Sequence, residues 1–281
     1  MRSITANNAD CQLRFCITVS SMDDMQIRPL LGSTLALMAH PDDEVIVCGA
    51  LLQRMQRAVV VFATDGAPRI EGFWQKYGSR EAYAEVRRRE ARRALRTAGA
   101  TPIFLSDLVP GGVADQELFR TLPAAMAALK KVMAQVRPEC VLTLAYEGGH
   151  PDHDAACFMA SFMGRRARLP VWESPLYHRK ADGTCVLQAF PDLTGEEVES
   201  RSECSQLENK IAMFHTYQSQ GLLLESFRPD YEIYRPLAAY DFTRPPLPWK
   251  LNYEWWQWSM TGAEVSAAFA EYLRREGGSG R

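Results

Sequence analysis

Residues 34–44 read TLALMAHPDDE, an apolar run that stops at a His-Pro pair followed by three acidic residues. A short apolar run bounded by turn residues is typical of a buried strand. Segment 44–56 then carries apolar residues at helical spacing, so the order is strand, loop and helix. This unit predicts one step of an α/β fold, with the polar loop at the carboxyl end of the strand.

The same succession recurs along the chain. Further buried strands are expected at 58–64, 103–105, 140–145 and 171–177, and helices at 79–97, 115–136, 154–168 and 196–218. The helix at 79–97 has Ser79 as a plausible N-cap and Gly99 as its stop. Because strands alternate with helices, we expect a Rossmann-like α/β fold, a mostly parallel sheet with helices on both faces.

Composition limits the class of protein. The chain has 281 residues, 47% apolar and 23% charged, as is ordinary for a globular fold. Lys plus Arg is 32 against 34 Asp plus Glu, so a net charge of −2 gives no general attraction to nucleic acid or to an anionic membrane. The arginine-rich stretch 87–96 is interleaved with glutamates and is interpreted as a solvated helix face. No apolar run approaches the ~20 residues of a membrane span.

The cysteines and the start of the chain bear on its location. Seven cysteines are scattered without a Cys-x-x-Cys pair, which indicates neither a disulfide framework nor a thiolate zinc site. We expect most of them to be small buried residues in a reducing compartment. Residues 1–10 lack the apolar core of a signal peptide, so a cytoplasmic location is expected.

The histidines indicate the chemistry. Three of the five lie in two matching phrases, HPDDE at 40–44 and HPDHD at 150–154, each between a predicted strand and a predicted helix. One such phrase is usually only a turn, but two at equivalent strand ends favour a shared site. A catalytic zinc takes three protein ligands and keeps a position open to water. His40, Asp43 and His153 would supply two imidazoles and one carboxylate.

The remaining polar residues of the phrases suit catalysis. Asp42 is left free to act as the general base on a water molecule. His150 is placed to stabilise a developing oxyanion or to protonate a leaving nitrogen. Asp152 or Asp154 would orient an imidazole N–H. His178 and His215 lie outside both phrases and are expected to have structural or pocket-edge positions.

These phrases resemble those of the LmbE-like, or PIG-L, family of zinc-dependent de-N-acetylases. The family's two motifs are present as AHPDDE at 39–44 and HPDH at 150–153. Three weaker likenesses support them: Thr64-Asp65-Gly66, Arg87 to Glu90, and Lys210 to Gln220. The resemblance covers 34–220, so we expect a single domain over 1–281 in which 221–281 is a C-terminal extension completing the pocket or the core.

The resemblance implies hydrolysis of an N-acetyl group, usually on an N-acetylglucosamine unit, to free amine and acetate. It also implies one zinc ion per chain, although other divalent transition metals suit the same ligands. Carried over position by position, it assigns the metal to His40, Asp43 and His153, the general base to Asp42, the oxyanion to His150, and the tuning of His150 to Asp152.

Other pocket residues are less well determined. Some family members have a tyrosine just before the second motif, where this chain has Gly148 and Gly149, which leaves Tyr146 as the candidate. Arg69 and Arg87 are candidate substrate contacts. The tail contains Trp249, Trp255, Trp256 and Trp258, which either form a sugar-stacking wall or pack the core, and we favour packing.

Two alternatives stay open. One is an amidase with the same zinc chemistry that acts on another N-acyl or thiol-conjugate substrate. The other is a metal-free binding protein, which is disfavoured because every ligand position holds a competent residue. The expected partner is a small N-acyl amino sugar or glycoconjugate, with no nucleic acid and no membrane span, and a homo-oligomer is compatible with the sequence.

Overall fold

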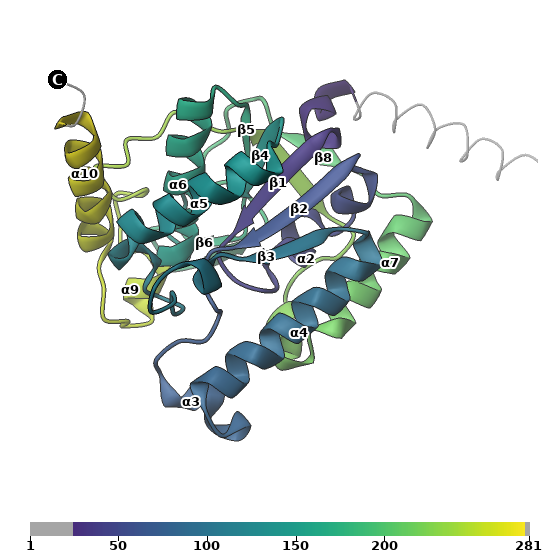
Figure 1. The fold of residues 1–281 in the computed structure, drawn as a ribbon, viewed down its shortest axis with the longest axis horizontal. Coiled ribbons are helices and arrows are strands. Elements are labelled where there is room, and N and C mark those ends of the chain that lie inside the picture. Colours follow the sequence, from purple (N-terminus) through teal and green to yellow (C-terminus); the bar gives the residue numbers. More distant parts are fainter. Residues whose placement is uncertain (1–24, 279–281) are drawn as a thin grey trace, which may run out of the picture.

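The computed structural model describes residues 25–278, which build a seven-stranded sheet in the order β3-β2-β1-β4-β5-β9-β8 (Figure 1). The strands are β1 Ser33–Met38, β2 Arg57–Phe62, β3 Thr101–Phe104, β4 Cys140–Leu144, β5 Val171–Ser174, β8 Val198–Ser200 and β9 Glu232–Pro236. The first five are parallel, whereas β9 and β8 join antiparallel. A separate two-stranded sheet pairs β6 Tyr177–Arg179 with β7 Cys185–Leu187.

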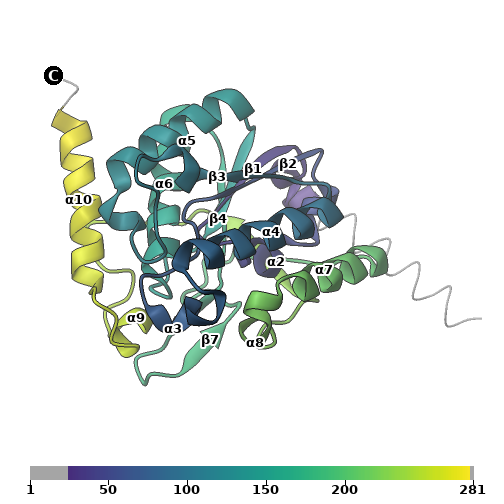
Figure 2. The same cartoon turned by 60° about the horizontal axis from the view of Figure 1, so that its bottom comes forward.

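Helices cover both faces of the large sheet. The α-helices are α2 Asp43–Cys48, α3 Glu71–Trp74, α4 Arg80–Ala98, α5 Leu122–Val136, α6 Pro151–Ala167, α7 Cys204–Thr216, α8 Gly221–Leu224, α9 Asn252–Trp255 and α10 Gly262–Gly278. Figure 2 shows α5 and α6 on one face and α2, α4 and α7 on the other. The 3₁₀ turns are η1 Arg28–Leu31, η2 Leu51–Arg54, η3 Gln75–Tyr77, η4 Leu105–Leu108, η5 Leu118–Arg120 and η6 Gln218–Gln220. The predicted fold class, a mostly parallel α/β sheet, is confirmed.

The helix at 79–97 is confirmed as α4, together with both of its end signals. The Ser79 hydroxyl accepts a hydrogen bond from the Ala82 amide, and Gly99 closes the helix in the left-handed conformation at φ 70°. The strands expected at 58–64, 103–105 and 140–145 are also present, within one or two residues at each end.

Two predicted helices are shorter than expected because side chains elsewhere take their backbone amides. The helix expected at 44–56 ends at Cys48, where the amides of Ala50 and Leu51 donate to the Glu232 carboxylate. The helix expected at 115–136 begins only at Leu122. Upstream of it, the amides of residues 116 and 118 donate to the Asp152 carboxylate.

Three further boundaries differ. The strand expected at 171–177 stops at Ser174, and Tyr177 begins the separate strand β6. The helix expected at 196–218 begins at Cys204, because residues 198–200 pair with β9 as edge strand β8. The helix expected at 154–168 begins three residues earlier, at Pro151, so the second histidine phrase lies in its first turn.

The segment expected as a C-terminal extension contributes to the main fold. Strand β9 lies between β5 and β8 in the large sheet, and α10 packs against α5 and α6. Phe269 of α10 is fully buried and stacks on Phe158 of α6 with 4.6 Å between ring centroids. The residues after 220 therefore complete both the sheet and the core.

The cysteines are divided between the core and the surface. Cys48, Cys140 and Cys157 are buried as expected, whereas Cys185 and Cys204 are exposed. Cys11 and Cys16 lie outside the described residues. Among the helices of 25–278, none is both long and apolar enough to cross a bilayer.

A buried ion pair ties α7 to β9 and to the end of α2. The Lys210 ammonium lies 2.8 Å from Glu232 Oε1 and donates to the Ile46 carbonyl at 3.0 Å, and Lys210 has no exposed surface. Glu232 also holds the two amides that end α2. Removal of the cation would leave this carboxylate buried without its charge partner.

We predict that Lys210→Ala lowers the free energy of unfolding by about 3 kcal/mol or more, since breaking a buried pair strands one charge. Lys131→Ala, on the exposed face of α5, is the control and should stay within about 0.5 kcal/mol of the parent. Urea unfolding measures both. Equal stability of the two variants would contradict the proposed importance of the pair.

Candidate metal centre

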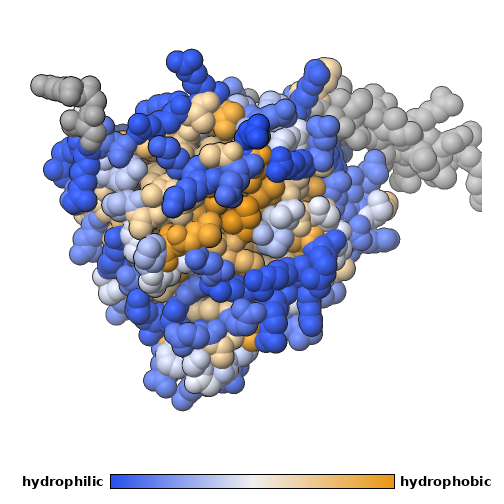
Figure 3. All heavy atoms as spheres, viewed as in Figure 1, coloured by the Kyte–Doolittle hydropathy of each residue, from blue (hydrophilic) through white to orange (hydrophobic). Residues whose placement is uncertain are grey.

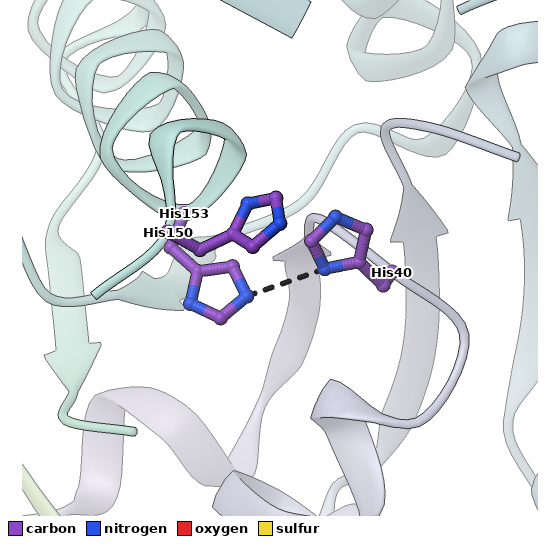
Figure 4. Close-up of side chains that lie close together, drawn as sticks. All are labelled: His40, His150 and His153. Atoms are coloured by element: carbon purple, nitrogen blue, oxygen red, sulfur yellow. Dashed lines mark hydrogen bonds between the residues drawn. The ribbon is translucent and has the colours of Figure 1, made fainter. Parts of the chain in front are cut away.

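The two histidine phrases meet at one edge of the sheet. Strands β1 and β4 are hydrogen-bonded neighbours, with Leu37 opposite Thr143, so the loops that follow them emerge side by side. The strand order also reverses at this point, since β2 and β3 lie on one side and β5 on the other. Such a switch point opens a crevice beyond the carboxyl ends of the strands. Figure 4 shows the rings of His40, His150 and His153 facing one another there.

The three expected metal ligands converge. His40 Nδ1 lies 3.2 Å from His153 Nε2, and Asp43 Oδ1 lies 3.4 Å from the same nitrogen. Asp43 Oδ2 is 3.7 Å from His40 Nδ1. With zinc bonds of about 2.0–2.1 Å, neighbouring ligand atoms of a tetrahedral site lie roughly 3.3 Å apart. The observed spacings are close to that value.

Surrounding contacts direct the donor atoms inward. Asp43 Oδ2 accepts from the amides of Ala39 and His40, which leaves Oδ1 directed at His153. The second ring nitrogen of His40, Nε2, lies 3.1 Å from Asp152 Oδ2. A carboxylate on the far nitrogen of an imidazole fixes its tautomer and strengthens it as a ligand. His153 Nδ1 is buried and has no hydrogen-bond partner within 25–278.

The charges around the cluster favour a cation. Burial by itself lowers the pKa of His40, but the carboxylates of Asp115, Asp152 and Asp43 raise it well above its ordinary value. Burial would raise the pKa of Asp43, yet His153 and His40 hold it well below its usual range. Two imidazoles and a carboxylate surrounded by further carboxylates fit a divalent transition metal.

Asp42 lines the cavity beside this cluster in an unusual backbone conformation, with φ 129°. Its Oδ1 lies 2.8 Å from Arg87 Nη2, and its amide donates to Glu44 Oε2 at 3.1 Å. Burial raises the pKa of Asp42 to about 6, against the opposing charge of Arg87. The carboxylate is therefore held in place while its basicity is increased.

The Asp152 carboxylate contacts more than the expected histidine. Its Oδ2 lies 3.9 Å from His150 Nδ1, and its closer contacts are with His40 and with the amides of Gln116 and Leu118, at 2.6 and 3.0 Å. His150 is the N-cap of α6, so its Nδ1 accepts from the Asp152 amide at 3.1 Å. This capping geometry turns His150 Nε2 toward another carboxylate, that of Asp115, at 3.3 Å.

Sequence reasoning missed Asp115. It lies within 3.5 Å of His40 Nε2 and 3.9 Å of Arg87 Nη1, in addition to His150. The residue was placed at the start of a helix, whereas it belongs to the loop that follows β3 and η4. A signal was present, because Gly111 and Gly112 in the same stretch, both with positive φ, are poor helix formers. A third loop at this sheet edge thus contributes an acid.

The tyrosine near the metal cluster is not the expected one. Tyr146 donates its hydroxyl to the Arg244 carbonyl and packs against Phe242, away from the cavity. Tyr177 lines the cavity, with its ring centroid 5.3 Å from that of His153. Strand β6 passes so close to the second motif that a Cβ at Gly149 would lie 1.9 Å from the Tyr177 carbonyl oxygen. The glycine therefore admits Tyr177.

The cavity above the cluster measures about 490 Å³ and is walled partly by the tail. Trp256 and Trp258 line it, and the Trp258 ring lies 4.9 Å from that of His150. Trp249 and Trp258 also pack against the core, as expected, and the Trp249 indole donates to the Arg179 carbonyl. Trp256 is 44% exposed and does not pack in the core.

The two candidate arginines differ in position. Arg87 lines the cavity, whereas Arg69 does not line it and its side chain is 70% exposed. His178 is buried against Glu147, at 3.3 Å. His215 is exposed on α7. Neither histidine lines the cavity.

Residues 35–162 match the PIG-L family, described as GlcNAc-PI de-N-acetylase. This stretch is similar to a PIG-L domain. That match contains both histidine phrases, most of β1, and all of β2, β3 and β4. None of the curated proteins matches the chain.

Solved structures share the fold of this chain. The deacetylase Dbv21 of the A40926 pseudoaglycone is 21% identical, with a TM-score of 0.57 over 74% of this chain and 98% of its own. The deacetylase of teicoplanin biosynthesis, in complex with teicoplanin, is 18% identical, with a TM-score of 0.54 over the same shares. The 4-carboxy-2-hydroxymuconate hydratase GalB from Pseudomonas putida KT2440 is 18% identical, with a TM-score of 0.50 over 74% and 95%. A hydratase and deacetylases thus share this architecture, so the reaction has to be argued from the site.

We predict that the purified protein takes up about one zinc ion per chain and that His153→Ala abolishes this uptake, because the variant loses one of three ligands. His215→Ala, which changes an exposed histidine remote from the cluster, is the control and should keep the metal. Elemental mass spectrometry after dialysis against zinc measures both. Full zinc content in His153→Ala would refute this ligand set.

Proposed function

We propose that this protein is a zinc-dependent hydrolase that removes the N-acetyl group from an N-acetylglucosamine-type sugar or glycoconjugate, releasing acetate and a free amine. The observation that carries the proposal is the convergence of His40, Asp43 and His153, with the Asp42 carboxylate beside them in the same cavity. The de-N-acetylase description of the matching family supports it.

The chain's own residues account for the proton transfers. His40, Asp43 and His153 would hold a divalent metal ion, which would supply Lewis acidity to the amide carbonyl and lower the pKa of a water molecule. Asp42, held by Arg87, accepts the proton of the water that attacks the carbonyl carbon. The C–N bond then breaks, and the protonated Asp42 returns this proton to the leaving nitrogen, so that the products are acetate and the free amine.

His150 is proposed to stabilise the oxyanion. Its Nδ1 accepts from a backbone amide, so in the neutral ring the proton is on Nε2, the nitrogen that faces Asp115. Burial lowers the pKa of His150, and the neighbouring His40 lowers it further, which keeps the ring neutral. A neutral imidazole with a fixed N–H donor suits stabilisation of a developing negative oxygen.

Several finer features are part of the proposal. Zinc is the proposed metal, with one ion per chain, because imidazole and carboxylate are its usual ligands. The expected cytoplasmic location and a homo-oligomeric state stay predictions. The alternative, an amidase on another N-acyl or thiol-conjugate substrate, uses the same residues, and a panel of N-acyl sugars and conjugates separates the two.

We predict that Asp42→Asn lowers kcat by a factor of about 10² or more while the metal content stays unchanged, because the amide cannot accept the water proton. Acetate release from a methyl glycoside of N-acetylglucosamine measures kcat, and elemental analysis measures the metal. A variant that keeps full activity would overturn Asp42 as the base.

We predict opposite effects for two tyrosine variants. Tyr177→Phe should lower kcat by about 10-fold with an unchanged melting temperature, because its hydroxyl makes no hydrogen bond within 25–278 and its ring borders the metal cluster. Tyr146→Phe should keep kcat but lower the free energy of unfolding by about 1 kcal/mol, because the Arg244 carbonyl loses its donor. The reverse pattern would assign the catalytic tyrosine to position 146.

A further inference from the structure

Glu44 is the last residue of the first histidine phrase, and the proposed reaction gives it no part. Its side chain has no exposed surface. One carboxylate oxygen, Oε2, accepts a hydrogen bond from the Asp42 amide at 3.1 Å, and the other, Oε1, accepts one from the Tyr217 hydroxyl. Glu44 therefore joins the proposed base to a residue 173 positions further along the chain.

Tyr217 is fixed in place at the end of α7. It is the C-cap of that helix, and its amide donates to the Phe214 carbonyl. Helix α7 packs against α2, which begins directly after Asp42. Although apolar side chains reach the surface across the middle of the face in Figure 3, the Tyr217 ring is fully buried. Water is therefore excluded from its hydrogen bond to Glu44, which strengthens that bond.

The backbone at Asp42 depends on outside support. Asp42 has φ 129° and ψ −23°, a combination that residues other than glycine rarely adopt. Such a conformation is costly and persists only when surrounding contacts hold it. Arg87 holds the Asp42 carboxylate and the carbonyl of the preceding Pro41, whereas Glu44 holds the Asp42 amide. Loss of the contact on the amide would allow this peptide to turn toward an ordinary φ.

The orientation of this peptide sets the direction of the Asp42 side chain. In the proposed reaction, on which this step rests, the carboxylate has to meet the attacking water beside the metal cluster. A displacement of about 1 Å in a catalytic group can lower a rate by a factor of about 10². A contact that fixes the Asp42 amide therefore affects kcat without touching the substrate.

We propose that Tyr217 is a positioning residue, which acts through Glu44 to hold the Asp42 backbone in the conformation that directs its carboxylate at the water. The Tyr217 hydroxyl fixes the rotamer of Glu44, and Glu44 fixes the Asp42 amide. Without the hydroxyl, the Glu44 side chain turns to other rotamers and releases the amide. Neither Tyr217 nor Glu44 lines the cavity, so neither contacts the substrate.

The first test measures kcat and KM of zinc-loaded Tyr217→Phe for the methyl glycoside of N-acetylglucosamine. We expect kcat to fall about 10-fold or more, with KM and metal content close to those of the parent, since only the direction of the base changes. Tyr240→Phe is the matched control, because the Tyr240 hydroxyl also donates to a buried glutamate, Glu173, at 2.9 Å, and Tyr240 does not line the cavity. This control should keep the parent's kcat.

Variants of Glu44 show whether Tyr217 acts through it. Glu44→Gln should keep kcat within about 3-fold, because the amide oxygen still accepts from Asp42 and the amide nitrogen donates to the Tyr217 oxygen. Glu44→Ala loses both contacts and should lower kcat at least as far as Tyr217→Phe. Adding Tyr217→Phe to Glu44→Ala should lower kcat no further, since the side chain that couples the two residues is gone. An additive loss would assign Tyr217 another route of action and would overturn the inference.

A measurement without substrate separates this inference from the proposed reaction. Amide hydrogen exchange, followed by NMR, reports on the Asp42 N–H directly, and it should be at least about 10-fold faster in Tyr217→Phe and unchanged in Tyr240→Phe. This result supports the inference even if the parent hydrolyses no N-acetyl sugar, in which case only the proposed function fails. Unchanged exchange at Asp42 in Tyr217→Phe overturns the inference, as does a parent-like kcat in that variant, and an active parent then leaves the proposed function intact.

Discussion

The parallel pairing of β1 with β4 is the constraint on which the candidate site depends. It brings together two imidazoles that are 113 residues apart in the sequence, so that their ring nitrogens lie 3.2 Å from each other. The strand order reverses at this same pair, and the helices that follow lie on opposite faces of the sheet, which keeps the crevice open. Other residues of the site are added around this junction.

Two helices are shorter than their sequence pattern predicts, because nearby backbone amides bind buried carboxylates. The amides before α5 donate to Asp152, and that carboxylate in turn contacts His40. In a similar way, the amides after the early end of α2 donate to Glu232. This contact anchors the helix that begins with Asp43. Backbone groups that an uninterrupted helix would satisfy internally instead hold buried carboxylates. The helices lose some internal hydrogen bonds, and in exchange the buried carboxylates of Asp152 and Glu232 are held in fixed positions.

The features that sequence patterns predicted are those with local signals. An apolar run followed by His-Pro-Asp indicated β1 and β4, and their likeness to each other predicted that His40 and His153 would meet. Tyr177 carried no such signal, and the glycines before Asp115 argued only against a helix there, because contact between distant segments brings both residues to the cavity. The closer contact of Asp152 with His40 was not predicted, because it depends on the start of α6 at Pro151, which makes His150 an N-cap. Strand β8 was misread because its pairing with β9 comes from far along the chain.

The backbone of Asp42 has a consequence for how the fold tolerates change. A non-glycine residue at φ 129° stores on the order of 1–3 kcal/mol of strain, which surrounding contacts have to offset. Arg87 also donates to the carbonyls of Pro41 and Gly66, and so holds together the loops that follow β1 and β2 as well as the Asp42 carboxylate. Arg87 therefore fixes the backbone conformation around Asp42. The residue proposed to accept the proton is also the one whose backbone is strained. At Asp42, a substitution that relieves the backbone strain would raise stability but would remove the proposed base, so selection for stability and selection for turnover would oppose each other.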